Sequence, residues 1–190
     1  MNAQFELAMD KQTFLSWVQT QLHRHEWVKG RPVMQQGGSW NHGRIAMRFV
    51  KLFGNLLDES QWSILGGNLA VDLGDEIRFP DVMVARNQED GKVLSTDAPV
   101  VLVEVLSPSS VTTDINTKPP LYMALQTLEV YIVASQSEAK VWVWQRDSAR
   151  ADRPFPAKPR EFNGFDAVVA LTTLGIGIPL KDIYRGITPV

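Results

Sequence analysis

The segment that most restricts the fold is an apolar run with one acid inside it, Val100-Val101-Leu102-Val103-Glu104-Val105-Leu106. A run that is apolar at both alternating positions is typical of a central strand buried on both faces of a sheet. An ionised carboxylate is costly there unless it is paired or bound to a metal. Two interpretations of Glu104 are therefore open. It is a functional acid, or it lies at the end of the strand and faces solvent or pairs with an arginine.

Apolar periodicity elsewhere predicts a mixture of helices and short strands. Helical spacing changes to alternation near Trp62, and Gly66-Gly67 and Gly74-Asp75 break the strands that follow. Polar loops are expected over 87–99 and 150–159. Helices are expected over 10–23, from an N-cap at Asn41 through Leu57, and over 119–127. Strands are expected on both sides of a turn near Gly30 and over 62–85 and 100–106. Residues 130–133 and 140–144 are expected to form a hairpin closed across Gln136-Ser137. This order predicts an α/β, or α+β, mixed sheet flanked by helices.

Composition restricts the chemistry. The 190 residues are the length of one domain, expected over 1–190, and they contain no cysteine, which excludes disulfides, thiolate zinc sites and a cysteine nucleophile. The three histidines leave little room for a His-rich site, so any metal would be held mainly by oxygen, which favours Mg²⁺, Mn²⁺ or Ca²⁺ over zinc. A net charge of −2 argues against a broadly basic nucleic-acid-binding surface but leaves a local patch open.

No segment is expected to enter a membrane. Residues 1–11 include Glu6, Asp10 and Lys11 and lack the basic-then-apolar order of a signal peptide. The longest weakly charged apolar stretch, 167–180, is shorter than the span of about 20 residues that a bilayer requires. A cytoplasmic protein is therefore expected.

A second acid enters an apolar strand in Phe79-Pro80-Asp81-Val82-Met83-Val84. Asp81 precedes Glu104 by 23 residues, on a separate strand candidate, so neighbouring strands would bring both carboxylates to one edge of the sheet. Two carboxylates at a strand end form a hard-oxygen site for a divalent cation, completed by water and phosphate. The alternative for Asp81 is a turn residue after a proline.

The sequence around both acids resembles a known family. Arg78-Phe79-Pro80-Asp81-Val82 and Val103-Glu104-Val105-Leu106-Ser107-Pro108-Ser109 are similar to the putative restriction-endonuclease family called Uma-two (Uma2), in the PD-(D/E)XK nuclease superfamily. Further similarities are His25-Glu26-Trp27-Val28-Lys29-Gly30, His42-Gly43-Arg44-Ile45, the Asp114, Lys118 and Tyr122 set, and Glu129-Val130-Tyr131-Ile132-Val133. The resemblance covers roughly residues 20–135 and implies a restriction-endonuclease-like fold.

The resemblance also implies a site and an activity. Asp81 and Glu104 would bind a divalent metal, Mg²⁺ or Mn²⁺, with the backbone carbonyl of Val105 as a third ligand, and Glu26 would be an additional acid. The implied activity is metal-dependent hydrolysis of phosphodiester bonds in DNA by an endonuclease. A homodimer is expected because a nuclease that cuts both strands of a duplex often works as one.

The lysine of the site is displaced in this chain. The superfamily's usual lysine lies two residues after the glutamate, where this sequence has Leu106. The related family places it in the following helix, which makes Lys118 the candidate to orient water or stabilise phosphate charge. Pro119-Pro120 follows directly, and a residue before proline avoids the α region. Lys118 is therefore expected at the edge of the helix rather than inside its first turns.

Candidate DNA contacts are His42 at a helix start, the Arg44, Arg48 and Lys51 face of the same helix, and Tyr122. Each has a simpler interpretation: His42 as a surface or capping residue, the basic face as solvated, and Tyr122 as packing against the Glu104 strand. The tryptophans are more typical of core or interface positions than of base stacking.

Three functions follow. The first is a metal-dependent DNA endonuclease that uses Asp81, Glu104, Lys118 and Glu26. The second is a catalytically impaired relative that binds nucleic acid or protein, which Leu106 and the prolines after Lys118 favour. The third is a hydrolase of another phosphoester, because the acids alone do not identify the substrate.

Overall fold

The structure is a computed structural model that describes residues 8–35, 37–107, 113–147, 149–150 and 152–187. Its helices are α1 (Lys11–Val18), α2 (Trp40–Leu56), α3 (Lys118–Met123), which a π-helical turn at Thr113–Thr117 precedes, and α4 (Leu180–Ile183). Its strands are β1 (His25–Val28), β2 (Arg31–Met34), β3 (Trp62–Gly66), β4 (Ala70–Asp72), β5 (Glu76–Arg78), β6 (Val82–Arg86), β7 (Ser95–Thr96), β8 (Pro99–Val105), β9 (Val130–Ala134), β10 (Lys140–Gln145), β11 (Arg160–Asn163), β12 (Val168–Leu171) and β13 (Ile176–Pro179).

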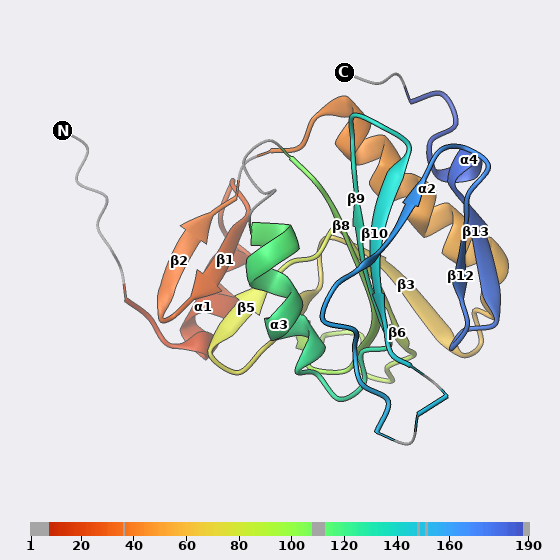
Figure 1. The fold of residues 1–190 in the computed structure, drawn as a ribbon. Helices are drawn as coiled ribbons and strands as arrows, with labels where there is room; N and C mark the ends of the chain where they lie inside the picture. Colours follow the sequence, from red (N-terminus) through yellow and green to blue (C-terminus); the bar gives the residue numbers. More distant parts are fainter. Residues whose placement is uncertain (1–7, 36, 108–112, 148, 151, 188–190) are drawn as a thin grey trace.

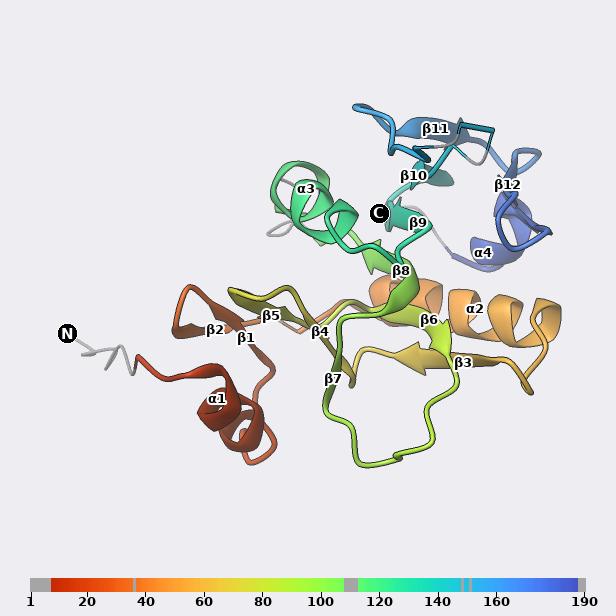
Figure 2. The same ribbon diagram turned by 90° about the horizontal axis from the view of Figure 1, so that it is seen from below.

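The larger sheet has the order β11-β10-β9-β8-β6-β3 (Figure 1). Neighbouring strands are antiparallel except β8 and β9, which are parallel and are joined across the segment that contains α3. Seen from below, this sheet lies between α3 on one side and α2, β12 and α4 on the other (Figure 2). The predicted mixed sheet flanked by helices is confirmed, and so is the expected central position of the apolar strand.

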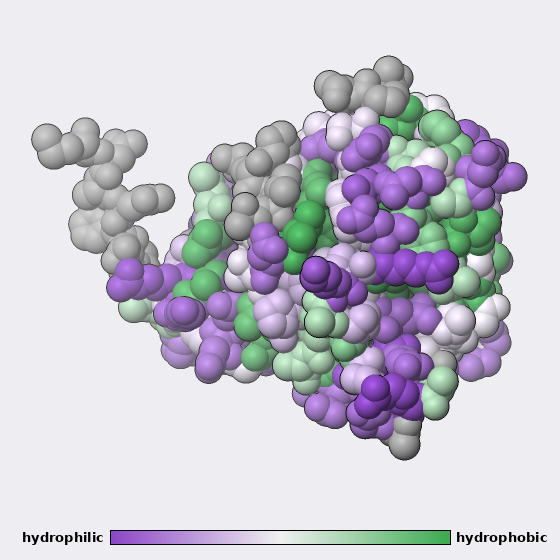
Figure 3. All heavy atoms as spheres, viewed as in Figure 1, coloured by the Kyte–Doolittle hydropathy of each residue, from purple (hydrophilic) through white to green (hydrophobic). Residues whose placement is uncertain are grey.

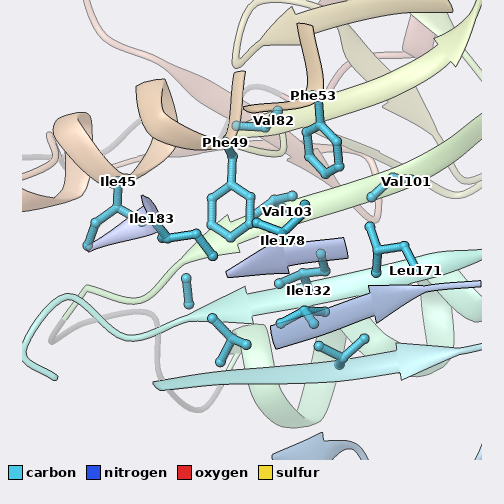
Figure 4. Close-up of a cluster of buried hydrophobic side chains, with 14 of the residues drawn as sticks. Ile45, Phe49, Phe53, Val82, Val101, Val103, Ile132, Leu171, Ile178 and Ile183 are labelled. Carbon is cyan, nitrogen blue, oxygen red and sulfur yellow. The ribbon is translucent and has the colours of Figure 1, made fainter. Parts of the chain in front are cut away.

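The main hydrophobic core lies on the α2 face of the larger sheet. Ile45, Phe49 and Phe53 are spaced along one side of α2 and point at the sheet, where alternate residues of β6, β8 and β9 meet them (Figure 4). The β12–β13 hairpin and α4 complete this core with Leu171, Ile178 and Ile183, all fully buried (Figure 4). The alternation of strand side chains explains why β8 is apolar at every second position on this face.

The opposite face of the same strands carries the site. Leu102 of β8 packs there with Met83, Tyr131 and Trp144. Because side chains two residues apart share a face, Glu104 points to this side, toward α3. The acid in the apolar run therefore faces away from the main core.

A second sheet lies beside the first and has the order β2-β1-β5-β4-β7, with α1 packed on it (Figure 1). Phe14 of α1 and Ile77 of β5 are both fully buried between helix and sheet. The chain leaves β5, passes through Phe79-Pro80-Asp81 and enters β6 of the larger sheet. Pro80, which lacks a backbone N–H, interrupts the strand as expected and separates the two sheets.

The limits of three predicted helices are wrong. The first helix ends at Val18 rather than near residue 23, and Asp10 caps its start by accepting a hydrogen bond from Thr13 N at 2.9 Å. The cap of α2 is Ser39, not Asn41, because the Ser39 hydroxyl accepts the N–H of His42 at 3.2 Å. Helix α3 begins one residue before the expected start and ends at Met123 rather than 127. The hairpin of β9 and β10 is confirmed, with Ala134 opposite Val141.

Within the ranges given above, no helix is both long and apolar enough to cross a bilayer. The face seen in Figure 1 is mostly hydrophilic, and hydrophobic residues gather near β12, β13 and α2 (Figure 3). Single exposed apolar residues of this kind, such as Val168 and Phe165, are ordinary on protein surfaces.

Candidate active site

One cavity of about 610 Å³ lies where the two sheets meet α2 and α3. Its lining combines residues from both sheets and both helices, far apart in the sequence. Six residues that the sequence singled out for catalysis, metal binding or DNA contact line it: Glu26, His42, Asp81, Glu104, Val105 and Lys118.

Asp81 and Glu104 are brought together by strand pairing. Strands β6 and β8 are antiparallel neighbours with Val82 opposite Val103, so the two acids lie next to each other at one end of the pair. The expectation that adjacent strands bring both carboxylates to one edge is confirmed. Asp81 Oδ2 accepts the backbone N–H of Val105 at 2.8 Å, which fixes the carboxylate relative to β8.

Glu104 is buried rather than exposed at a strand end, with 4% of its surface accessible. Its Oε1 lies 2.8 Å from Lys118 Nζ and accepts a hydrogen bond from the Tyr122 hydroxyl at 3.0 Å. The interpretations of a solvent-facing or arginine-paired acid are therefore wrong. The partner cation is a lysine from α3.

Lys118 sits at the start of α3, as its position before Pro119 predicts, yet its side chain is only 7% exposed. Its ammonium group lies 2.9 Å from Asp114 Oδ1 and 3.9 Å from Glu26 Oε1, in addition to Glu104. The π-helical turn before α3 carries Asp114. Three carboxyl groups therefore surround one ammonium. Asp114 had no predicted role, although its spacing of four residues from Lys118 on a helix was a usable signal.

The charges of this cluster shift the pKa values of its members. Burial raises the pKa of Glu104 to about 8, and Asp114 and Asp81 add to the rise while Lys118 offsets part of it. Burial alone would lower the pKa of Lys118, but the carboxyl groups around it outweigh burial and raise it, so the ammonium stays charged. Burial and the charge of Glu104 raise the pKa of the Tyr122 hydroxyl, which stays a hydrogen-bond donor.

Glu26 enters the cavity from β1 of the smaller sheet. Arg78 Nη1 donates to Glu26 Oε2 at 2.6 Å, and Gln35 Nε2 donates to the same oxygen at 2.9 Å. Arg78 also bonds Glu76 Oε2, through Nε at 2.8 Å and Nη2 at 2.5 Å. Arg78 and Glu76 had no predicted roles. The only signal for their pairing in the sequence is that Glu76 and Arg78 have opposite charges and lie two residues apart on one strand.

His42 lies in the first turn of α2, where its Nε2 is 2.9 Å from Asp81 Oδ1. Its Nδ1 is buried and has no hydrogen-bond partner within the described ranges. The capping interpretation is wrong, because Ser39 caps this helix and His42 is the residue that is capped. His42 is a component of the cavity rather than of the outer surface.

The other four candidate DNA-contact residues do not line the cavity. Tyr122 is fully buried, and its hydroxyl points at Glu104, so the packing interpretation is confirmed and a phosphate contact is wrong. Arg44 Nη1 donates to the carbonyl of Gly186 at 2.5 Å, and Arg48 Nη2 to that of Arg185 at 3.4 Å. Lys51 is exposed. The predicted basic strip thus partly holds the segment after α4.

The residues present fit a divalent cation of the oxygen-binding kind. Among the described residues, no three His, Asp or Glu side chains form a cluster that would hold a metal unaided. Asp81 and Glu104 nevertheless line one cavity with the backbone of Val105. Mg²⁺ is usually bound by one or two carboxylates together with waters and phosphate, so this donor set suits Mg²⁺ or Mn²⁺ rather than zinc.

Comparison with known proteins agrees with this geometry. Residues 11–176 match the Uma2 family, described as "Putative restriction endonuclease". The chain is 27% identical over 184 residues to the uncharacterized protein slr1290 of Synechocystis sp., covering 94% of this chain and 93% of that one. It is 24% identical over 128 residues to sll1609 of the same organism, covering 65% of this chain and 72% of that one.

A solved structure shares the fold. The crystal structure of a putative nuclease belonging to DUF820 from Anabaena variabilis superposes with a TM-score of 0.70, at 18% identity, over 86% of this chain and 91% of the other. The match of the family over most of the sequence, together with the placement of Asp81 and Glu104, identifies the chain as a member of the Uma2 family of putative restriction endonucleases.

Proposed function

We propose that the protein is a metal-dependent endonuclease that hydrolyses phosphodiester bonds in DNA. The observation that carries the proposal is the excess of acid in the connected buried cluster. Four buried carboxyl groups, those of Glu26, Glu76, Glu104 and Asp114, are joined by ion pairs to two permanent cations, Arg78 and Lys118, and Asp81 adds a fifth carboxyl group beside Glu104. Acids in excess favour the binding of a further cation. Burial is the main cause of the raised pKa of Glu104, and Asp114 and Asp81 add to the rise.

Each residue then has a defined part. Asp81, Glu104 and the carbonyl of Val105 would hold Mg²⁺ or Mn²⁺. When bound, the ion supplies Lewis-acid activation of water and neutralises charge at the phosphate. Lys118 orients Glu104 and places a positive charge at the cavity floor, where negative charge develops on the phosphate. Glu26, fixed by Arg78, keeps the ammonium of Lys118 in place.

The position of Lys118 supports an active enzyme over a catalytically impaired relative. Leu106, which occupies the usual lysine position, is 8% exposed and packs in the core with Leu102 and Tyr131. The lysine missing there is supplied by α3, and its ammonium reaches Glu104 in spite of Pro119-Pro120. A cytoplasmic location and a homodimer, both expected from the sequence, belong to the same proposal and are tested by cell fractionation and light scattering.

The test compares Asp81→Asn with Asp166→Asn, an exposed aspartate away from the cavity. Plasmid, single-stranded and branched DNA are incubated with each protein and Mg²⁺ or Mn²⁺. We expect cleavage by the wild type and by the Asp166 variant, and loss of at least about a hundredfold in the Asp81 variant, a typical size for a group that stabilises transition-state charge.

Calorimetric titration with Mn²⁺ separates the alternatives. If the protein is an enzyme, it binds Mn²⁺ and cuts DNA, and Asp81→Asn abolishes the Mn²⁺ binding. An impaired relative cuts none of the three DNA forms although it is folded. Cleavage that survives Asp81→Asn unchanged contradicts the proposal.

A further inference from the structure

We infer that the site accepts an unpaired DNA strand in preference to an intact duplex. This inference rests on the proposed function and specifies its substrate. The first observation is depth: the side chains of Glu26, Glu104 and Lys118 are 3%, 5% and 7% exposed. A scissile phosphate must therefore enter the cavity to reach them. The volume of about 610 Å³ is in the range of pockets that enclose one small ligand, not of a surface that receives a rod-like duplex.

The second observation concerns glycines in the cavity wall. Gly43 of α2 and Gly66 of β3 line it, have ordinary φ angles, and have no atom within 4 Å of an added Cβ. Neither backbone conformation nor packing within the protein therefore requires glycine at these places, although glycine weakens helices and strands. A close approach by something outside the protein would explain them, as glycine allows a ligand to contact the main chain.

Two other glycines of the wall differ. A Cβ at Gly38 would meet the His42 ring at 2.8 Å, and a Cβ at Gly67 would meet the Arg24 guanidinium at 2.9 Å. These glycines make room for side chains of the cavity itself. The contrast identifies Gly43 and Gly66, together with Gly37, as the parts of the wall that are open toward a ligand.

The third observation is the rim. Leu22 and Met47 line the cavity and are 98% and 63% exposed, and Trp40, next to the lining residue Ser39, is 81% exposed. Large apolar side chains beside a cavity offer apolar surface to a ligand that enters it. The bases of an unpaired strand offer apolar faces that can stack on such side chains, whereas a duplex keeps its bases stacked inside. Leu22 and Met47 line the same cavity as Glu104 and Lys118. The molecule that contacts these apolar side chains is therefore the substrate strand.

The fourth observation is that two cations of the predicted basic strip are held by the C-terminal segment. Duplex binding draws most of its affinity from phosphate contacts to Lys and Arg. Arg44 and Arg48, two of the three cations of the predicted strip, donate to backbone carbonyls of the C-terminal segment, and the net charge is −2. The cavity instead offers apolar side chains on which bases can stack and main chain that a strand can approach closely. Both suit a single strand.

The test uses one fluorescently labelled DNA oligonucleotide, alone and annealed to its complement. Anisotropy without added metal measures binding, and cleavage with Mn²⁺ measures turnover. We expect the single strand to bind and be cut at least about tenfold better than the duplex. Trp40→Ala should remove most of that preference, whereas Phe165→Ala, at an exposed aromatic that does not line the cavity, should keep it.

Gly43→Ala and Gly54→Ala form a second pair, both on α2 and both with open space around an added Cβ, but only Gly43 lines the cavity. Both variants should raise the melting temperature, since alanine favours helix. Only Gly43→Ala should weaken single-strand binding. A stabilised protein with impaired binding cannot be attributed to misfolding.

The outcomes separate this inference from the proposed function. Cleavage of duplex as fast as single strand overturns the inference and leaves the nuclease intact. Failure to cut or bind either form contradicts the proposed function itself. A Trp40→Ala variant that changes the molecular mass in light scattering but not DNA affinity also overturns the inference, because the rim would then be an interface between two copies.

Discussion

Lys118 is the residue on which the buried charges of the site depend. It contacts Glu104 and Asp114 within 2.9 Å, and all three side chains are nearly inaccessible to solvent. Breaking a buried ion pair by removing one partner leaves the other charge uncompensated, which is far more costly than the net value of the pair. The contacts that hold Lys118 at the cavity therefore also hold α3 against β8.

At a pH above the pKa of Glu104, Lys118→Met should lower the free energy of unfolding by about 3–5 kcal/mol, because it leaves the ionised Glu104 buried without its cation. Urea denaturation gives the value. Lys51→Met, at an exposed position of α2, is the control and should change stability by less than about 0.5 kcal/mol. Equal effects of the two substitutions would show that the buried cluster contributes nothing specific.

Glu104 also makes stability depend on pH. Its pKa is about 8 in the folded protein, against 4.5 for an ordinary glutamate, so the folded state binds this proton more tightly. The resulting stabilisation is complete below pH 4.5 and is lost as the pH rises through about 8. Between these values the wild type should lose on the order of 1–3 kcal/mol relative to Glu104→Gln, which cannot ionise.

Urea denaturation at several pH values between those limits measures the difference in slope. Glu59→Gln, an exposed glutamate, is the control and should follow the wild type. Parallel curves for the wild type and Glu104→Gln would mean that Glu104 ionises freely in the folded protein.

The start of helix α2 connects local structure to the site. Ser39 caps the helix through the N–H of His42, and the His42 ring is held at Asp81. Ser39→Ala should therefore cost about 1 kcal/mol of stability, the usual value of an N-cap. Ser16→Ala, in the exposed interior of α1, removes a hydroxyl without a cap and should be neutral or slightly stabilising.

Thermal unfolding of the two serine variants decides the point. If Ser39→Ala is as stable as Ser16→Ala, the helix begins independently of this hydroxyl. The position of His42 would then be set by the packing of α2 on the sheet alone.

Elements with a strong periodic pattern could be predicted from the sequence, whereas side-chain partners far apart in the sequence could not. The strand around Leu102 and the hairpin of β9 and β10 follow from apolar runs and turn residues. The wrong cap at Asn41 arose because serine and asparagine are both good caps, and only the chain path shows which oxygen meets the free N–H. The π-helical turn before α3, which carries the buried Asp114, has no local signal in the sequence.

The same limit applies to the site. Asp81 and Glu104 were visible because an acid in an apolar strand is unusual. Arg78 was not, because its burial depends on Glu26, which is 52 residues away in the sequence. The Arg44 face looked solvated or DNA-binding, and its actual partner is the carbonyl of Gly186, 142 residues away.

The site exists only where the two sheets meet. Glu26 comes from the smaller sheet, Asp81 and Glu104 from the larger, and Lys118 from a helix that packs on the larger one. A nuclease that cuts both strands of a duplex often works as a dimer, whereas cleavage of an unpaired strand needs one site. The oligomeric state therefore depends on which substrate the cavity accepts.

The last sixth of the chain is required by the rest of the fold. β12, β13 and α4 cover the α2 face of the larger sheet, where Leu171, Ile178, Leu180 and Ile183 are fully buried. Burying each such side chain contributes about 1.5–3 kcal/mol, so their joint loss approaches the whole stability of about 5–15 kcal/mol typical of a domain.

A chain that ends at Pro159 should show no cooperative thermal transition in near-ultraviolet circular dichroism. The full chain with Val168→Ser, an exposed position of β12, should melt as the wild type does. A cooperative transition in the shortened chain would mean that residues 160–190 are a separate unit, contrary to the single domain expected over 1–190.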